Sequence, residues 1–308
     1  MIRSRAPVRI SLGGGGTDIS PYKDEHGGIV LSTTIDRYTY CTVKKSDVSI
    51  YQSQFARAAK RFLNRRGKVS IMHFSEAPPG SGLGGSSTLM VAILKALGEY
   101  HNVKLSLHEL AEAAYHIERD LLGMKGGWQD QFAAAYGGWN LMEFSRKRTK
   151  IVRLNIAEDT LRELLASLIL VDLGKSHFSP DLIERQIASF KRPEVLANLE
   201  RMKDITRQMV VRILAGDVLE LGSLLTQEWD LKKTLDKKIS NATIDGFHAG
   251  MLKRGAVGGK LLGAGNWGHM VFISDISKRE GLLKYVESTG FHSVPFKFDS
   301  QGVVAWTV

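Results

Sequence analysis

The feature that most constrains this chain is a glycine-rich segment that runs directly into an apolar helix. Residues 80–87 read Gly-Ser-Gly-Leu-Gly-Gly-Ser-Ser, and an apolar run from Thr88 to about Tyr100 follows without a break. Glycines leave backbone N–H groups uncovered, so a bulky anion can approach the main chain closely. The positive end of the helix points at the same place. The pattern predicts a phosphate-binding loop at the start of a buried helix.

Other interpretations of these glycines are disfavoured by the surrounding sequence. No lysine follows them, so the segment is not a Walker-type loop. Gly80, Gly82 and Gly85 match the dinucleotide pattern G-x-G-x-x-G, but residues 75–79 separate them from the expected strand Val69–Phe74. A flexible turn rarely needs four glycines and two serines ahead of an apolar helix. Phosphate binding is therefore the favoured function of the segment.

Length and charge define the general class of the protein. The 308 residues, 43% of them hydrophobic, suit one large domain or two packed ones. A formal charge of +10 suits anionic ligands such as nucleotides and sugar phosphates. Because the basic residues are scattered, we expect no nucleic-acid partner. The single cysteine, Cys41, predicts a reducing cytoplasm, and no signal peptide or apolar span for a membrane is seen.

The periodic segments predict an α+β fold with two lobes and an active site in the cleft between them. Strands are expected in the first half over Ala6–Leu12, Ile29–Thr34 and Tyr38–Lys44. A capping box at Ser106 begins a further helix, which Gly123 ends. The second half is richer in helix, at Pro180–Phe190, Glu194–Ala215, Val218–Leu235 and Asn241–Arg254. We expect an N-terminal phosphate-binding lobe of residues 1–155 and a C-terminal lobe of residues 156–308.

Several polar residues supply the ingredients of phosphoryl transfer. This chemistry needs a phosphate cradle, a divalent metal, positive charge and a group that orients or deprotonates the acceptor. Magnesium prefers oxygen ligands and keeps most of its waters, so Ser86 and Glu118 fit as its protein ligands. Arg9 stands just before a first glycine run, and Asp130 follows residues 126–129. The structural alternatives are helix capping for Asp130, Ser86 and Ser87, a surface ion pair for Glu118, a solvated strand position for Arg9 and a turn contact for Asp18.

These motifs resemble those of the GHMP kinase superfamily, named for its galactokinase, homoserine kinase, mevalonate kinase and phosphomevalonate kinase members. The resemblance spans almost the whole chain, in the family's order, at residues 9–18, 79–87, 118–130 and 258–268. Within the superfamily, the first glycine run, the doubled serine and Gln129-Asp130-Gln131 look most like the D-glycero-D-manno-heptose 7-phosphate kinases. The resemblance implies a cytoplasmic enzyme that uses ATP and Mg²⁺ to phosphorylate the anomeric hydroxyl of that sugar phosphate, giving the 1,7-bisphosphate.

The resemblance also implies a role for each matching residue. Asp130 would accept the proton of the acceptor hydroxyl, and Arg9 would lie near that hydroxyl and the γ-phosphate. Ser86 and Glu118 would be the magnesium ligands. The residues that would hold the nucleotide phosphates are Pro79, Gly80, Ser81, Gly82, Leu83, Gly84, Gly85, Ser86 and Ser87. The residues that would contact the sugar or its phosphate are Gly13, Gly14, Gly15, Gly16, Thr17, Asp18, Lys175 and His177.

The chain departs from the family pattern at two tryptophans. In the third motif, residues 263–268, Asn266 and Trp267 stand where glycines are expected, and Trp128 stands where relatives often carry a small or basic residue. Bulky side chains here could change the acceptor, or they could be packing anchors. The open alternatives are another small-molecule kinase, for a hexose, fucose or an isoprenoid alcohol, and a non-catalytic ligand-binding protein. We expect a monomer or a homodimer.

Overall fold

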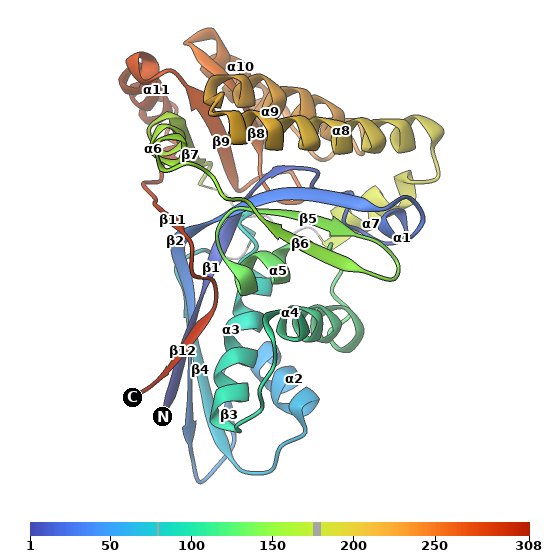
Figure 1. Cartoon of the computed structure of the whole chain (residues 1–308), viewed down its shortest axis with the longest axis vertical. Coiled ribbons are helices and arrows are strands. Elements are labelled where there is room, and N and C mark those ends of the chain that lie inside the picture. The colour runs from blue at the N-terminus through green and yellow to red at the C-terminus, as the bar shows by residue number, and fades with distance from the viewer. Residues whose placement is uncertain (79, 175–179) are drawn as a thin grey trace.

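Two antiparallel-rich sheets with helices packed against them form the molecule (Figure 1), so the expected α+β fold is confirmed. The computed structural model describes residues 1–78, 80–174 and 180–308. The larger sheet consists of β1 (Ile2–Gly13), β2 (Gly28–Lys45), β3 (Ile50–Tyr51), β4 (Val69–Ser75), β5 (Asn140–Phe144), β6 (Thr149–Arg153), β11 (Phe298–Asp299) and β12 (Val304–Thr307). The smaller sheet has the order β10 (His292–Ser293), β7 (Leu168–Asp172), β9 (His269–Ser274) and β8 (Ala256–Leu261).

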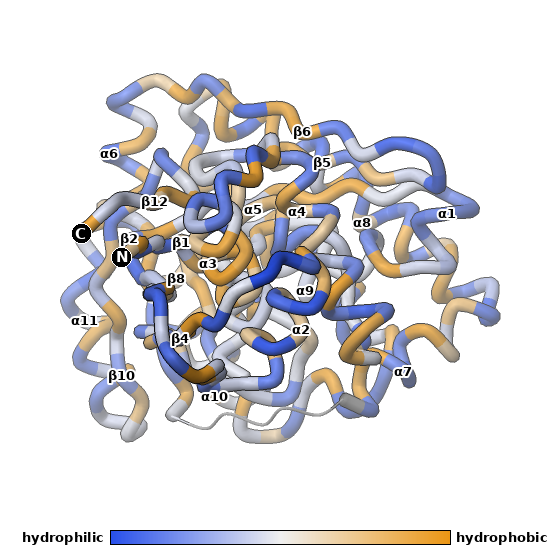
Figure 2. Tube along the Cα trace, turned by 90° about the horizontal axis from the view of Figure 1, so that it is seen from below, coloured by the Kyte–Doolittle hydropathy of each residue, from blue (hydrophilic) through white to orange (hydrophobic). Residues whose placement is uncertain are grey.

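Six helical segments of the described residues lie in each half of the chain. Those of the first half are α1 (Tyr22–His26), α2 (Gln54–Leu63), α3 (Gly85–Tyr100), α4 (Leu107–His116), the π-helical turn η1 (Ile117–Leu121) and α5 (Gln129–Tyr136). Those of the second half are α6 (Glu158–Ser167), α7 (Pro180–Ser189), α8 (Pro193–Ala215), α9 (Val218–Lys233), α10 (Ala242–Lys253) and α11 (Ile276–Ser288). Helix α3 packs on β1 and β2, and Figure 2 shows it as a largely hydrophobic segment. Across the described parts of the chain, no helix is long and apolar enough to cross a membrane.

A single strand, β2, replaces the two that the sequence predicts between Ile29 and Lys44, and that prediction was wrong. The intervening residues stay extended because they pair with a segment from the far end of the chain. Ile35 lies opposite Phe298 of β11, and the backbone N–H of Asp36 donates to the Lys297 carbonyl at 2.9 Å. These long-range hydrogen bonds hold residues 35–37 within the strand.

The C-terminal end of the chain returns to the first sheet. Strand β12 pairs with β1, with Thr307 opposite Ile2, and Figure 1 shows the two termini close together. Strand β1 also contributes to both hydrophobic cores: Ala6 packs with α3 and α4, whereas Ile10 packs with the helices of the second half. The lobes thus share a strand, and the division of the chain after residue 155 stays a prediction.

Candidate active site

Helix α3 begins at Gly85, three residues earlier than the sequence predicts. The last residues of the glycine-rich segment therefore form the first turn of the helix. Gly84 is the N-cap residue, with a left-handed φ of 78°. A Cβ atom on Gly84 would lie 3.3 Å from the Asp130 carboxyl carbon and 3.4 Å from the Arg9 guanidinium carbon. The amides at the start of a helix have no carbonyl partners inside the helix and attract anions. A phosphate on α3 would therefore lie directly beside Arg9 and Asp130.

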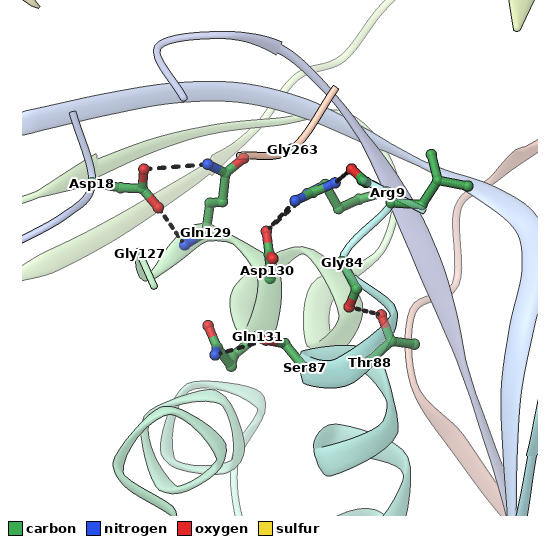
Figure 3. Close-up of polar contacts among 12 residues, drawn as sticks. Arg9, Asp18, Gly84, Ser87, Thr88, Gly127, Gln129, Asp130, Gln131 and Gly263 are labelled. Atoms are coloured by element: carbon green, nitrogen blue, oxygen red, sulfur yellow. Dashed lines mark hydrogen bonds and ion pairs between the residues drawn. The ribbon is translucent and has the colours of Figure 1, made fainter. Parts of the chain in front are cut away.

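Arg9 and Asp130 form an ion pair across the site, although they are 121 residues apart in the chain (Figure 3). Arg9 comes from β1 and Asp130 from the first turn of α5. The Arg9 Nε and Nη2 atoms lie 2.8 Å and 2.7 Å from Asp130 Oδ1, and Nη1 donates to the Gly82 carbonyl. Among the described residues, no hydrogen bond goes to Asp130 Oδ2. The carboxylate is thus fixed through one oxygen, and the other can face an acceptor.

Thr17 and Asp18, predicted to contact the sugar, bind the protein chain itself. Both are buried. The Thr17 hydroxyl donates to the Gly14 carbonyl at 2.8 Å. Asp18 Oδ1 accepts from the Gly16 amide at 3.1 Å and from the Gln129 side chain at 3.2 Å, and Oδ2 accepts from the Gln129 amide at 3.0 Å (Figure 3). Asp18 therefore ties the first glycine run to the residue before Asp130, and its contact with a sugar stays a prediction.

Glu118 is buried and not on the surface, and the structure brings it to Ser87 rather than to Ser86. Its carboxylate is 0% exposed within the π-helical turn η1 and accepts hydrogen bonds from the Ser87 hydroxyl and the Gln131 amide. Burial is the main cause that raises the pKa of Glu118. Its Oε1 atom has no hydrogen-bond partner among the described residues. Ser86 is exposed in the same turn of α3. The Ser87 hydroxyl and the unpartnered Oε1 atom of Glu118 fit Mg²⁺, a cation that takes oxygen ligands.

Two comparisons with known proteins show the family of the chain. Residues 53–138 match the family described as GHMP kinases N terminal domain. The D-glycero-alpha-D-manno-heptose 7-phosphate kinase of Campylobacter jejuni is 32% identical, over 100% of this chain and 99% of its own length. This chain belongs to the GHMP kinase family.

Solved structures of this GHMP kinase's relatives share its fold over the full length. A D-glycero-D-manno-heptose 1-phosphate kinase from Bacteroides thetaiotaomicron gives a TM-score of 0.82 at 28% identity, covering 100% of this chain and 99% of that one. The galactokinase of Lactococcus lactis, complexed with galactose, gives 0.76 at 16% identity, covering 100% of this chain and 95% of that one. The second likeness concerns the fold alone.

The third motif of this GHMP kinase lies against the phosphate-binding loop. A Cβ atom on Gly82 would lie 2.7 Å from the Leu262 carbonyl oxygen, and the His269 amide donates to the Ser81 carbonyl at 3.0 Å. Trp267 packs against the second-lobe core. Trp128 stacks on Tyr115, with ring centroids 3.7 Å apart. Both tryptophans thus have packing partners. Pro79, Lys175 and His177 lie outside the described residues.

Two charged side chains of α9 enter the site, and sequence reasoning missed both. Glu228 Oε1 accepts from the Gly14 amide at 3.1 Å, and Oε2 lies 2.5 Å from Lys260 Nζ. Lys232 Nζ donates to the Gly263 carbonyl at 2.6 Å. A signal was present: Leu221, Leu225, Glu228 and Lys232 follow one another at helical spacing on the buried face of α9. Charged residues within such a stripe need a partner inside the protein.

We expect Glu118→Gln to abolish the stabilisation of the protein by Mg²⁺. The thermal stability of the metal-free protein should stay unchanged or rise. Because burial raises the pKa of Glu118, the metal-free fold loses stability as the pH rises from the usual pKa of a glutamate through the raised value. Mg²⁺ needs the ionised form, so its stabilising effect should grow over the same pH range. Thermal melts at pH 5.5 and 8, with ADP and with either MgCl₂ or EDTA, measure both effects.

The control for this prediction is Glu112→Gln, at a half-buried glutamate of α4 that pairs with His108. This variant should keep the response of the parent protein to Mg²⁺ at both pH values. A Glu118→Gln protein that Mg²⁺ still stabilises at pH 8 as strongly as the parent protein would contradict the assignment of Glu118 as a metal ligand.

Proposed function

We propose that this GHMP kinase transfers the γ-phosphoryl group of ATP to the anomeric hydroxyl of D-glycero-D-manno-heptose 7-phosphate, giving the 1,7-bisphosphate. The observation that carries the proposal is the Arg9–Asp130 pair beside Gly84, at the anion-attracting start of α3. The full-length similarity to a heptose 7-phosphate kinase supports the choice of sugar.

The chain's own residues suffice for positioning and proton transfer. The phosphates of ATP lie on residues 80–87, with the transferred group near Gly84. Asp130 Oδ2 accepts the proton of the anomeric hydroxyl as the oxygen–phosphorus bond forms and the bond to the leaving ADP oxygen breaks. Arg9 holds Asp130 through Oδ1 and places positive charge at the reacting centre. Ser87 and Glu118, with Ser86 next to them, would hold Mg²⁺, which supplies charge neutralisation to the phosphates when bound.

Coupled ADP release over a panel of acceptors tests this proposal. The panel contains D-glycero-D-manno-heptose with no phosphate, with phosphate at position 7 and with phosphate at position 1, together with galactose, fucose and mevalonate. The 1-phosphate is included because the Bacteroides relative is named for it. We expect the highest kcat/KM for the 7-phosphate and a product whose phosphorus resonances show phosphate at both ends.

The possible results separate the alternatives. Higher kcat/KM for the 1-phosphate, a hexose, fucose or mevalonate would replace the proposed acceptor and keep the kinase. Nucleotide binding by calorimetry without turnover on any acceptor would favour a non-catalytic binding protein and overturn the proposal.

A further inference from the structure

Lys232 places a buried positive charge between the first glycine run and the third motif. Lys232 is 4% exposed, and its side chain extends from the last turn of α9 to the Gly263 carbonyl. Among the described residues, this carbonyl accepts the one hydrogen bond that Lys232 Nζ donates. An ammonium group has three N–H donors. A further hydrogen-bond acceptor is therefore needed to satisfy the remaining N–H donors of Lys232.

Three polar atoms lie close together beside Gly15. A Cβ atom on Gly15 would meet Ser11 Oγ at 3.4 Å, Lys232 Nζ at 3.5 Å and Gln129 Nε2 at 3.6 Å, all at ordinary contact distance. Ser11 and Gln129 are both at least nine-tenths buried. Within the described part of the chain, Ser11 Oγ has no hydrogen-bond partner, and Gln129 Nε2 donates to Asp18, which engages one of its two N–H bonds. Buried polar groups are normally paired, so the free donors of Lys232, Ser11 and Gln129 at this point indicate a ligand that accepts hydrogen bonds.

The nearby carboxylates are already engaged, which leaves Lys232 without an ion pair among the described residues. Asp130 pairs with Arg9, and Glu228 pairs with Lys260. Asp18 is nearby but accepts its hydrogen bonds from Gln129 and Gly16. Burial, followed by repulsion from Lys260, lowers the pKa of Lys232 to about 8, with Arg9 adding to the repulsion and Glu228 and Asp18 opposing it. A charge held in this way favours an anion as its ligand over a neutral hydroxyl.

We propose that Lys232 is a further catalytic residue, which binds an oxygen of the phosphoryl group as it passes from ATP to the acceptor. Gln129 Nε2 and Ser11 Oγ complete this oxygen site as hydrogen-bond donors. Arg9 and Lys232 then approach the transferred group from two different elements, β1 and α9, and share the negative charge on its equatorial oxygens. The inference rests on the proposed phosphoryl transfer but not on which sugar is the acceptor.

The first test compares Lys232→Met, Lys232→Arg and Lys233→Met. We expect Lys232→Met to lower kcat about 10²–10³-fold with little change in the affinity for ADP, as for the loss of one donor to a transition-state oxygen. Lys232→Arg should retain more of the activity because it keeps the charge. Lys233→Met is the matched control, since Lys233 is partly exposed and pairs with Asp230. Its kcat should stay within threefold of the parent value.

The second test is the pH profile of kcat/KM, which a purely structural role would not change. For the parent enzyme, kcat/KM should fall as the pH rises through about 8, where the free ammonium group loses its proton. In Lys232→Arg this fall should move at least one pH unit higher, because guanidinium keeps its proton. The profile decides the matter even if Lys232→Met does not fold.

The outcomes distinguish this inference from the proposed function. A parent protein that phosphorylates no acceptor overturns both. A parent enzyme with normal turnover, whose folded Lys232→Met variant keeps kcat within threefold or whose Lys232→Arg variant keeps the parent pH profile, overturns the role of Lys232 alone.

Discussion

Replacing Asp130 by asparagine is expected to lower kcat about 10²–10⁴-fold, the usual contribution of a general base, while nucleotide affinity stays unchanged. An amide has nearly the same shape as the carboxylate, and its carbonyl oxygen can still accept a hydrogen bond from Arg9. The amide cannot take the proton of the acceptor hydroxyl. Coupled ADP release gives kcat, and calorimetry with ADP and Mg²⁺ gives the affinity for the nucleotide.

The matched control is Asp120→Asn, at an exposed aspartate of η1 whose carboxylate pairs with His116. It should turn over like the parent enzyme. If Asp130→Asn also turned over within threefold of the parent, Asp130 would be only a partner that holds Arg9 in place, and the proton would have to leave the hydroxyl by another route.

The sequence motifs predicted which residues gather at the candidate site, but not the contacts between them. Arg9, Glu118 and Asp130 were all predicted, because each stands in or next to a motif whose chemistry is recognisable locally. That Arg9 binds Asp130, and that Glu118 lies at Ser87 rather than Ser86, depends on how β1, α3 and η1 pack together. A helix has 3.6 residues per turn, so adjacent serines point in different directions, and only the packing decides which of them faces the carboxylate.

In the fold, too, local features were predicted from the sequence and long-range contacts were not. Segments with strong local signals were predicted closely, such as α8 (Pro193–Ala215) and α10 (Ala242–Lys253), because their periodicity and end signals lie within the segment or next to it. The continuous strand β2 was missed because Phe298 supplies the pairing at Ile35 from more than 250 residues away. The buried charges of α9 were missed for a related reason, since their partners lie on β1, β8 and two glycine runs.

Lys260→Met is expected to destabilise the fold by about 3–5 kcal/mol, the usual cost of removing one partner from a buried ion pair. The side chains of Lys260 and Glu228 are 1% and 0% exposed. Lys260 Nζ also donates to the Leu12 carbonyl at 3.1 Å, and Glu228 accepts from the Gly14 amide. Removal of the ammonium group leaves the Glu228 carboxylate buried without its counter-charge. Urea unfolding, with the free energy of unfolding extrapolated to water, measures the loss.

A double variant separates the buried charge from the packing around it. Glu228→Gln removes the negative charge but keeps an oxygen for the Gly14 amide, so Lys260→Met combined with Glu228→Gln should recover much of the stability that Lys260→Met alone loses. Lys284→Met, which removes one partner of the exposed pair with Glu280, should leave stability unchanged. A double variant no more stable than Lys260→Met would mean that lost packing, and not the uncompensated carboxylate, causes the damage. The Lys260–Glu228 pair binds the Leu12 carbonyl and the Gly14 amide, on either side of Gly13 at the start of the first glycine run. Loss of the pair should therefore also lower kcat in the fraction of the protein that remains folded.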